Sequence, residues 1–136
     1  MPRVMVVDDD EDIVQLIKFL MEREQFEVIE AYNGLEAYHK LTEDGPNKAA
    51  PDVIILDIMM PRLDGWSVLA LLAGDAGTRA VPVVVCSLVD DPELSHVLGA
   101  QGYLRKPVSE SELLAELTAV LRRPRVDSHR SPAPPR

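Results

Sequence analysis

The feature that most constrains the fold is an alternation between short, valine-rich apolar runs and longer segments with helical spacing. The runs are too short for helices, and β-branched side chains favour extended backbone, so each run predicts a strand. After the first run, Ile13, Ile17 and Leu20 recur three or four positions apart, which predicts an amphipathic helix. We expect strands at residues 3–7, 26–29, 53–56, 81–86 and 102–105.

The segments between the strands carry start and stop signals of helices. Asn33 is a suitable N-cap, and Ser109 with Glu112 three residues later forms a capping-box pattern. Gly99 is placed to end a short helix. Helices are expected over residues 13–21, 34–43, 66–73, 92–98 and 109–121.

Five strands that alternate with five helices predict an α/β fold with a doubly wound, five-stranded parallel sheet and helices on both faces. The strands lack polar alternation, which agrees with a sheet buried on both sides. In such a fold, functional groups collect at the carboxyl edge of the sheet, where strands end and loops begin.

Length and composition limit the possible classes of protein. With 136 residues and 46 % hydrophobic content, the chain can build one domain with a sizeable core. No run approaches the length of a membrane span, and five acids among the first twenty residues argue against a signal peptide. The lone Cys86 cannot form an internal disulfide, which fits a reducing compartment. We expect a cytoplasmic protein without membrane contact.

The net charge of −9 is unevenly distributed. Residues 122–136 contain five arginines and one aspartate, a charge of +4, so the first 121 residues stand at −13. An acidic body argues against nucleic-acid binding by the folded part. The Pro- and Arg-rich composition of residues 122–136 predicts a disordered basic tail that follows one domain over residues 1–121.

Polar side chains with useful chemistry follow four of the predicted strands. The first, third, fourth and fifth strands are followed, in order, by Asp8 to Asp10, Asp57, Ser87 and Lys106. Clustered carboxylates repel one another unless a cation relieves them, and an all-oxygen, partly hydrated pocket suits Mg²⁺. Such a pocket can hold a phosphoryl group on one carboxylate, with the metal and the lysine neutralising its oxygens.

Each of these residues also has a plain structural interpretation. Residues 8–12 could be the N-cap and first-turn acids of the following helix. Asp57 and Asp64 could be loop residues, and Lys106 before Pro107 could belong to a turn. Their joint position at successive strand ends favours a functional site.

The order and spacing of five motifs resemble the receiver domains of bacterial two-component response regulators. The motifs are VVDDDEDI, AYNGLEAY, LDIMMPRLDGW, PVVVCS and GAQGYLRKP, and they extend over about residues 3–121. The resemblance implies a flavodoxin-like strand order of 2-1-3-4-5, as in chemotaxis receivers. The part after residue 121 is too short for an output domain, so a stand-alone receiver is expected.

The resemblance implies roles for the acidic residues. Asp57 is implied as the phosphoacceptor, which attacks the phosphorus of a phosphohistidine on a histidine kinase or phosphotransfer protein. Asp9 is implied to bind Mg²⁺ or Mn²⁺ directly, Asp8 through water, and Met59 through its backbone carbonyl; Asp57 is implied as a further metal ligand. Asp10 matches a variable position and is expected to cap a helix.

The same resemblance implies roles for residues on the fourth and fifth strands. Ser87 is implied to hydrogen-bond the phosphoryl group, and Lys106 to pair first with Asp57 and then with a phosphoryl oxygen. Tyr103 is implied as an aromatic switch that turns inward when Ser87 moves. The Lys106–Pro107 peptide bond is expected to be cis.

The implied function is a signalling receiver whose face built from helix four, strand five and helix five changes shape to control binding of an unknown downstream protein. We expect no enzymatic activity beyond its own phosphorylation and dephosphorylation, and a monomer or weak homodimer. An aspartate-nucleophile phosphohydrolase is the alternative, but such enzymes usually carry a second aspartate where this chain has Met59. A nucleotide-binding module would need a Gly-rich loop after the first strand, where three aspartates stand instead.

The chain departs from the family pattern in three places. The segment between Ser87 and Gly99 is about three residues shorter than in many receivers, which predicts a short fourth helix. Leu88 stands where a small residue is usual and narrows access to the site, and Met59 and Val89 flank the site without a group to orient an attacking water, which predicts slow hydrolysis of the phosphoaspartate. The helix over residues 66–73 is apolar nearly all round; either small residues dilute its exposed side, or it presents an apolar patch to a partner.

Overall fold

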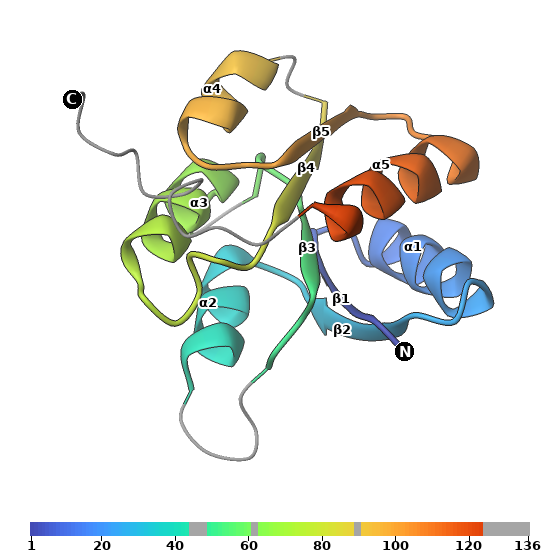
Figure 1. Cartoon of the computed structure of the whole chain (residues 1–136), viewed down its shortest axis with the longest axis horizontal. Coiled ribbons are helices and arrows are strands. Elements are labelled where there is room, and N and C mark those ends of the chain that lie inside the picture. Colours follow the sequence, from blue (N-terminus) through green and yellow to red (C-terminus); the bar gives the residue numbers. More distant parts are fainter. Residues whose placement is uncertain (44–48, 61–62, 89–90, 124–136) are drawn as a thin grey trace.

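The computed structural model describes residues 1–43, 49–60, 63–88 and 91–123, and its elements follow the predicted alternation (Figure 1). The strands are β1 (Arg3–Val7), β2 (Glu27–Ala31), β3 (Val53–Leu56), β4 (Val83–Ser87) and β5 (Gly102–Arg105). The helices are α1 (Glu11–Arg23), α2 (Gly34–Thr42), α3 (Gly65–Gly74), α4 (Pro92–Val97) and α5 (Glu110–Arg122).

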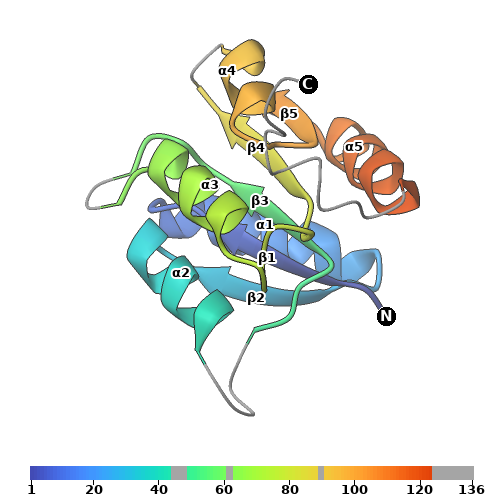
Figure 2. The ribbon, with the colours of Figure 1, turned by 60° about the vertical axis from the view of Figure 1, so that its left-hand side comes forward.

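The five strands form one parallel sheet in the order β2-β1-β3-β4-β5, so the predicted fold class and strand order are confirmed. Figure 2 shows β2 and β5 at the two opposite ends of this sheet. The three central strands are β1, β3 and β4, and Val7 of β1 lies opposite Leu56 of β3. This register places the residues that follow these two strands side by side.

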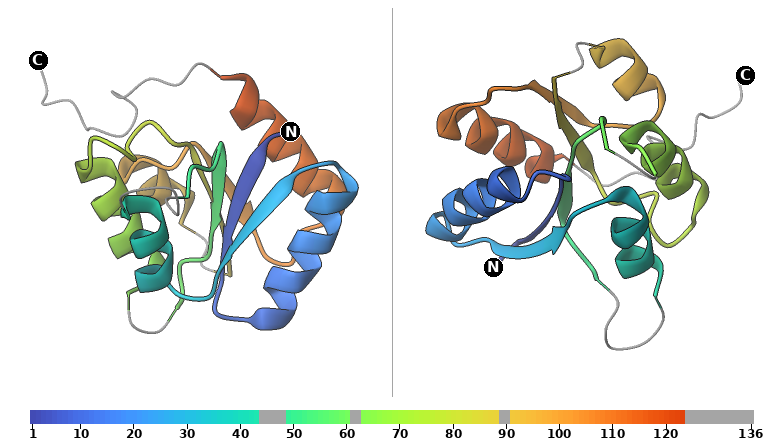
Figure 3. Two further views of the ribbon diagram at one scale, coloured as in Figure 1. Left: turned by 90° about the horizontal axis from the view of Figure 1, so that it is seen from below. Right: turned by 180° about the vertical axis from the view of Figure 1, so that it is seen from behind.

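Helices cover both faces of the sheet. Figure 3 shows α1 and α5 together on one side, and α2 and α3 on the other. Because side chains alternate along a strand, Met5 and Val7 enter the cluster under α2 and α3, whereas Val4 and Val6 enter the cluster under α1 and α5. Each face therefore has its own apolar core.

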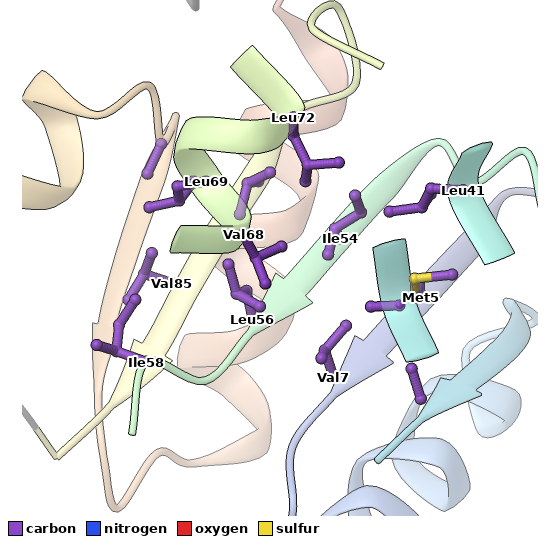
Figure 4. Close-up of a cluster of buried hydrophobic side chains, with 14 of the residues drawn as sticks. Met5, Val7, Leu41, Ile54, Leu56, Ile58, Val68, Leu69, Leu72 and Val85 are labelled. Carbon is purple, nitrogen blue, oxygen red and sulfur yellow. The ribbon is translucent and has the colours of Figure 1, made fainter. Parts of the chain in front are cut away.

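Helix α3 packs one side onto the sheet. Figure 4 shows Val68, Leu69 and Leu72 pointing toward the side chains of β3 and β4, and all three are fully buried. On the outer side of the helix, Leu71 is 39 % exposed and Ala70 is also exposed. This arrangement favours the interpretation in which small residues dilute the exposed side of α3.

The helix caps agree with the sequence signals. Asn33 caps α2 by accepting a hydrogen bond from the backbone N–H of Glu36. Ser109 and Glu112 form the predicted capping box at the start of α5. Asp10 caps α1, because its carboxylate accepts hydrogen bonds from two N–H groups in the first turn.

Two predicted strands have different ends in the structure. Strand β2 begins one residue later than expected, because the N–H of Phe26 donates to the carbonyl of Met21 at the end of α1. Strand β4 begins at Val83 rather than Val81, because the N–H of Val81 is used in a turn to Thr78 and Pro82 has no N–H to donate. Strand β4 in turn includes Ser87.

Within the described residues, no helix is both long enough and apolar enough to cross a membrane. Helix α5 continues to Arg122, one residue past the expected domain boundary. The predicted basic tail lies outside the described residues from position 124 onward.

A carboxylate site at the carboxyl edge of the sheet

The central strands bring two carboxylates together. Asp8 follows β1 and Asp57 follows β3, and the β1–β3 register makes them neighbours. The backbone continues the sheet hydrogen bonding for one more step, because the N–H of Asp57 donates to the carbonyl of Val7 at 2.9 Å. Both carboxylates are almost fully buried, with 3 % and 5 % of Asp8 and Asp57 exposed. The apolar strand before Asp57 therefore fixes its position.

Asp9 joins these two residues in an acidic group. The carboxylate oxygens of Asp8, Asp9 and Asp57 lie within 4.8 Å of one another, and Asp9 is exposed. Burial raises the pKa of Asp57 above its usual value, and the negative charge of Asp8 adds to this rise. Lys106 and hydrogen bonding from the Met59 backbone lower the pKa of Asp57 but do not cancel the rise.

Lys106 is the cation of the site. Its Nζ donates to Asp8 Oδ2 at 2.6 Å and lies 3.7 Å from Asp57 Oδ1. The expected pairing with Asp57 is therefore the longer of two contacts, and the sequence analysis missed the shorter one. The N–H of Asp10 donates to Asp8 Oδ1 at 2.9 Å, which leaves Asp8 Oδ2 available for the ammonium.

The electrostatics of Lys106 reflect these contacts. Burial lowers the pKa of Lys106, but the hydrogen bond to Asp8 and the charges of Asp8 and Asp57 together outweigh burial, so the net pKa is raised. The ammonium therefore stays charged at neutral pH. The Lys106–Pro107 peptide bond that follows it is cis.

The last two residues of β4 face opposite sides of the sheet. Cys86 lies in the core cluster under α1 and α5. Burial raises the pKa of the Cys86 thiol to about 11. Ser87 is fully buried, and its carbonyl accepts a hydrogen bond from the N–H of Lys106 at 2.9 Å. This bond holds the ends of β4 and β5 together beside the acidic group.

Tyr103 lies on the same face of the sheet as Ser87. It stands opposite Val85 on the neighbouring strand, and both Val85 and Tyr103 pack with the cluster under α2 and α3. Side chains two positions apart on a strand share a face, so Ser87 is directed to this side as well. The hydroxyl of Tyr103 accepts a hydrogen bond from the N–H of Asp91 at 3.2 Å.

Gly65 is a site residue that the sequence analysis missed. A Cβ atom at this position would lie 2.4 Å from the carbonyl oxygen of Asp57 and 2.6 Å from Cα of Ile58. The start of α3 therefore presses against the backbone of the phosphoacceptor candidate. The available signal was the Asp64-Gly65 pair, of which the sequence analysis considered only Asp64, as a possible loop residue.

The donor set fits a hard divalent cation. Three carboxylates face one ammonium, so the group keeps an excess of negative charge. Carboxylate oxygens are the ligands that Mg²⁺ and Mn²⁺ prefer, and the exposed Asp9 leaves the group open to water. Asp10 is engaged in capping α1 and lies outside this group.

The chain combines a parallel five-stranded sheet with acidic residues after its first and third strands. Comparison with known proteins assigns a chain of this kind to one family. Residues 4–118 match the family model of the response regulator receiver domain. The chain belongs to this family.

Relatives and solved structures agree with this assignment. The chain is 35 % identical to Protein PilG of Pseudomonas aeruginosa over 120 residues, which cover 86 % of this chain and 85 % of PilG. It is 43 % identical to the transcriptional regulatory protein PrrA of Mycobacterium tuberculosis over 125 residues, or 90 % of this chain and 51 % of PrrA. The chain thus spans about half the length of PrrA. The chemotaxis protein CheY4 of Vibrio cholerae superposes with a TM-score of 0.79 at 30 % identity, covering 88 % of this chain and 98 % of CheY4.

Family membership establishes the general function. The chain is a phospho-accepting receiver of two-component signalling, a class that works with histidine kinases or phosphotransfer proteins. Receivers are signalling proteins rather than conventional enzymes, and the comparisons offer no support for the phosphohydrolase alternative.

Proposed function

We propose that Asp57 is the residue that accepts the phosphoryl group. The observation that carries this proposal is its position: a buried carboxylate at the end of a central strand, grouped with Asp8 and Asp9 and 3.7 Å from the ammonium of Lys106. Asp8 is held at both oxygens by Asp10 and Lys106, and Asp9 is exposed. Asp57 is thus the carboxylate best placed between the cation and the acids.

In the proposed transfer, a carboxylate oxygen of Asp57 attacks the phosphorus of a phosphohistidine on the kinase or phosphotransfer protein. The new O–P bond forms as the P–N bond breaks, and the imidazole leaves with the electron pair of that bond. Lys106 offsets the negative charge that gathers on the phosphoryl oxygens. Asp9, Asp57 and the Met59 carbonyl, with Asp8 through water, would hold Mg²⁺ or Mn²⁺, which would supply further positive charge there.

The output side of the proposal follows the face formed by α4, β5 and α5. Phosphorylation draws Ser87 toward the phosphoryl group, and Tyr103 fills the space that Ser87 leaves. This shift changes the surface that a downstream protein contacts. We further propose that residues 1–121 act as the receiver and that the protein is a monomer or a weak homodimer in the cytoplasm.

The test is phosphorylation of the purified protein with ³²P-labelled acetyl phosphate and Mg²⁺. Asp57→Asn should abolish labelling, and removal of the metal with EDTA should abolish it in the unaltered protein. Asp64→Asn is the matched control, because Asp64 caps α3 outside the acidic group and asparagine also serves as a cap. Labelling that survives in the Asp57→Asn protein would show that the acceptor is misassigned.

A further inference from the structure

The start of helix α2 touches the chain that leads into helix α3. Gly34 is the first residue of α2 and is buried, and Figure 2 shows α2 beside α3. A Cβ atom on Gly34 would lie 2.2 Å from the carbonyl oxygen of Leu63, 3.1 Å from its carbonyl carbon and 2.7 Å from Cγ2 of Val68. Two of these three atoms belong to the backbone. The absence of a side chain at Gly34 therefore allows the backbone of Leu63 to lie directly against α2.

The segment that contacts Gly34 also contacts the proposed phosphoacceptor. Leu63 is followed two residues later by Gly65, whose lack of a side chain brings the first turn of α3 against the backbone of Asp57. The N–H of Gly65 donates to the carbonyl of Ile58 at 2.9 Å, which ties the same turn to the end of β3. The start of α2, residues 63–65 and the end of β3 thus form a stack of three backbone layers, with a glycine at each of its two contacts.

Helix α2 is held in place on its other side. The carboxylate of Glu36 accepts a hydrogen bond from the N–H of Tyr32, just after β2, at 2.6 Å. Ala37, one turn after Gly34, is fully buried in the core cluster under α2 and α3. Because the end of β2 and the core fix the first turn of α2, an atom added to Gly34 pushes residues 63–65 rather than the helix.

We propose that Gly34 is a positioning residue of the phosphorylation site, which sets the orientation of the Asp57 carboxylate through the backbone of residues 63–65. This inference rests on the proposed function and deepens it. Gly34 is not part of the acidic group, so its effect passes through the stack alone. The N–H of Asp57 is fixed by its hydrogen bond to Val7 at 2.9 Å, so a displaced Gly65 turns the Asp57 carboxylate relative to the other two acids of the group.

The test is the affinity of the purified protein for Mn²⁺, measured from the EPR signal of the free ion without any phosphodonor. The dissociation constant of Gly34→Ala should rise roughly tenfold, the lower end of the effect of outer contacts on metal affinity. Leu41→Val is the matched control, because it trims a fully buried side chain of the same helix and adds no atom near Leu63. The control should lower stability and leave the dissociation constant unchanged. An unchanged constant in Gly34→Ala, or an equal rise in Leu41→Val, would overturn the proposal.

A second pair of variants covers the case in which Gly34→Ala does not fold. Val68→Ala removes one of the atoms that a Cβ on Gly34 would meet and leaves the carbonyl of Leu63 in place. The double variant Gly34→Ala/Val68→Ala should bind Mn²⁺ more weakly than Val68→Ala alone, because the 2.2 Å contact with the Leu63 carbonyl remains. Equal affinities of these two variants would also refute a positioning role for Gly34.

The unaltered protein separates this proposal from the proposed function. If it binds no Mn²⁺ and takes no label from acetyl phosphate, the proposed function is refuted, and the role of Gly34 falls with it. If it binds Mn²⁺ and takes label, while Gly34→Ala binds Mn²⁺ equally well, the proposed function stands and only the role of Gly34 is overturned.

Discussion

Replacement of Gly65 by alanine should displace the backbone of Asp57, the proposed phosphoacceptor. The added Cβ would lie 2.4 Å from the carbonyl oxygen of Asp57, 2.6 Å from Cα of Ile58 and 2.8 Å from its Cδ1. Two of these three atoms belong to the backbone, so a change of side-chain rotamer cannot relieve the contact. Either the end of β3 or the first turn of α3 must move.

The size of the effect can be estimated from these contacts. Overpacking a core costs about 1–3 kcal/mol, and contact with backbone rather than flexible side chains places Gly65→Ala at the upper end of that range. Alanine recovers part of this cost, because it is favoured over glycine in a helix by up to about 1 kcal/mol. We expect a net destabilisation of about 2 kcal/mol, which corresponds to a fall of roughly 1 M in the urea midpoint.

Urea unfolding followed by circular dichroism measures this change. Gly74→Ala is the matched control in the same helix, because a Cβ at Gly74 meets no atom within 4 Å. The control should be neutral or stabilised by about 0.5 kcal/mol, since alanine restricts the unfolded chain. Equal urea midpoints for the two variants would refute the argument that Gly65 is required by its contact with Asp57.

Two further predictions concern pH dependence and phosphate lifetime. Glu30 has a pKa lowered from 4.5 to about 2, chiefly by the hydrogen bond from Lys18, so its contribution to stability is present above pH 4.5 and is lost as the pH falls toward 2. Urea midpoints at several pH values should show a shallower acid loss for Glu30→Gln than for the unaltered protein; parallel curves would contradict this. The side chains of Met59 and Leu88 are 63 % and 66 % exposed and carry no group that orients water, so phosphate release from the purified phosphoprotein should take minutes or longer. Release within a few seconds would refute this reasoning.

The fold was largely predictable because its signals are local and agree with one another. Continuous apolar runs such as residues 53–56 indicate strands buried on both faces, and intervening helical periodicity requires a parallel sheet. The errors fall where one backbone group has two possible partners. At Phe26, the helix end competes with the sheet for the N–H, and pattern alone does not show which partner prevails.

The sequence predicted which residues form the site better than it predicted the contacts between them. Strand ends and topology brought Asp8, Asp57 and Lys106 together without any knowledge of side-chain geometry. The preference of Lys106 for Asp8 depends on one backbone hydrogen bond, from Asp10, which turns one oxygen of Asp8 away from the lysine. Gly65 depends on a close backbone contact between β3 and α3, which residue spacing does not encode.

Two kinds of packing meet near the edge of the sheet where we propose that the switch lies. Close-packed interiors resist small displacements, and the strands that position Asp57 are buried on both faces, so they can hold the proposed acceptor still during transfer. Helix α4 is the opposite case, with a single buried side chain and an N-terminus tied by hydrogen bonds. In the switch that we propose, a new charge at Asp57 acts through Ser87 and Tyr103 on a rigid element and on a loosely held one. We expect the loosely held element to move, since the same free energy displaces it much farther.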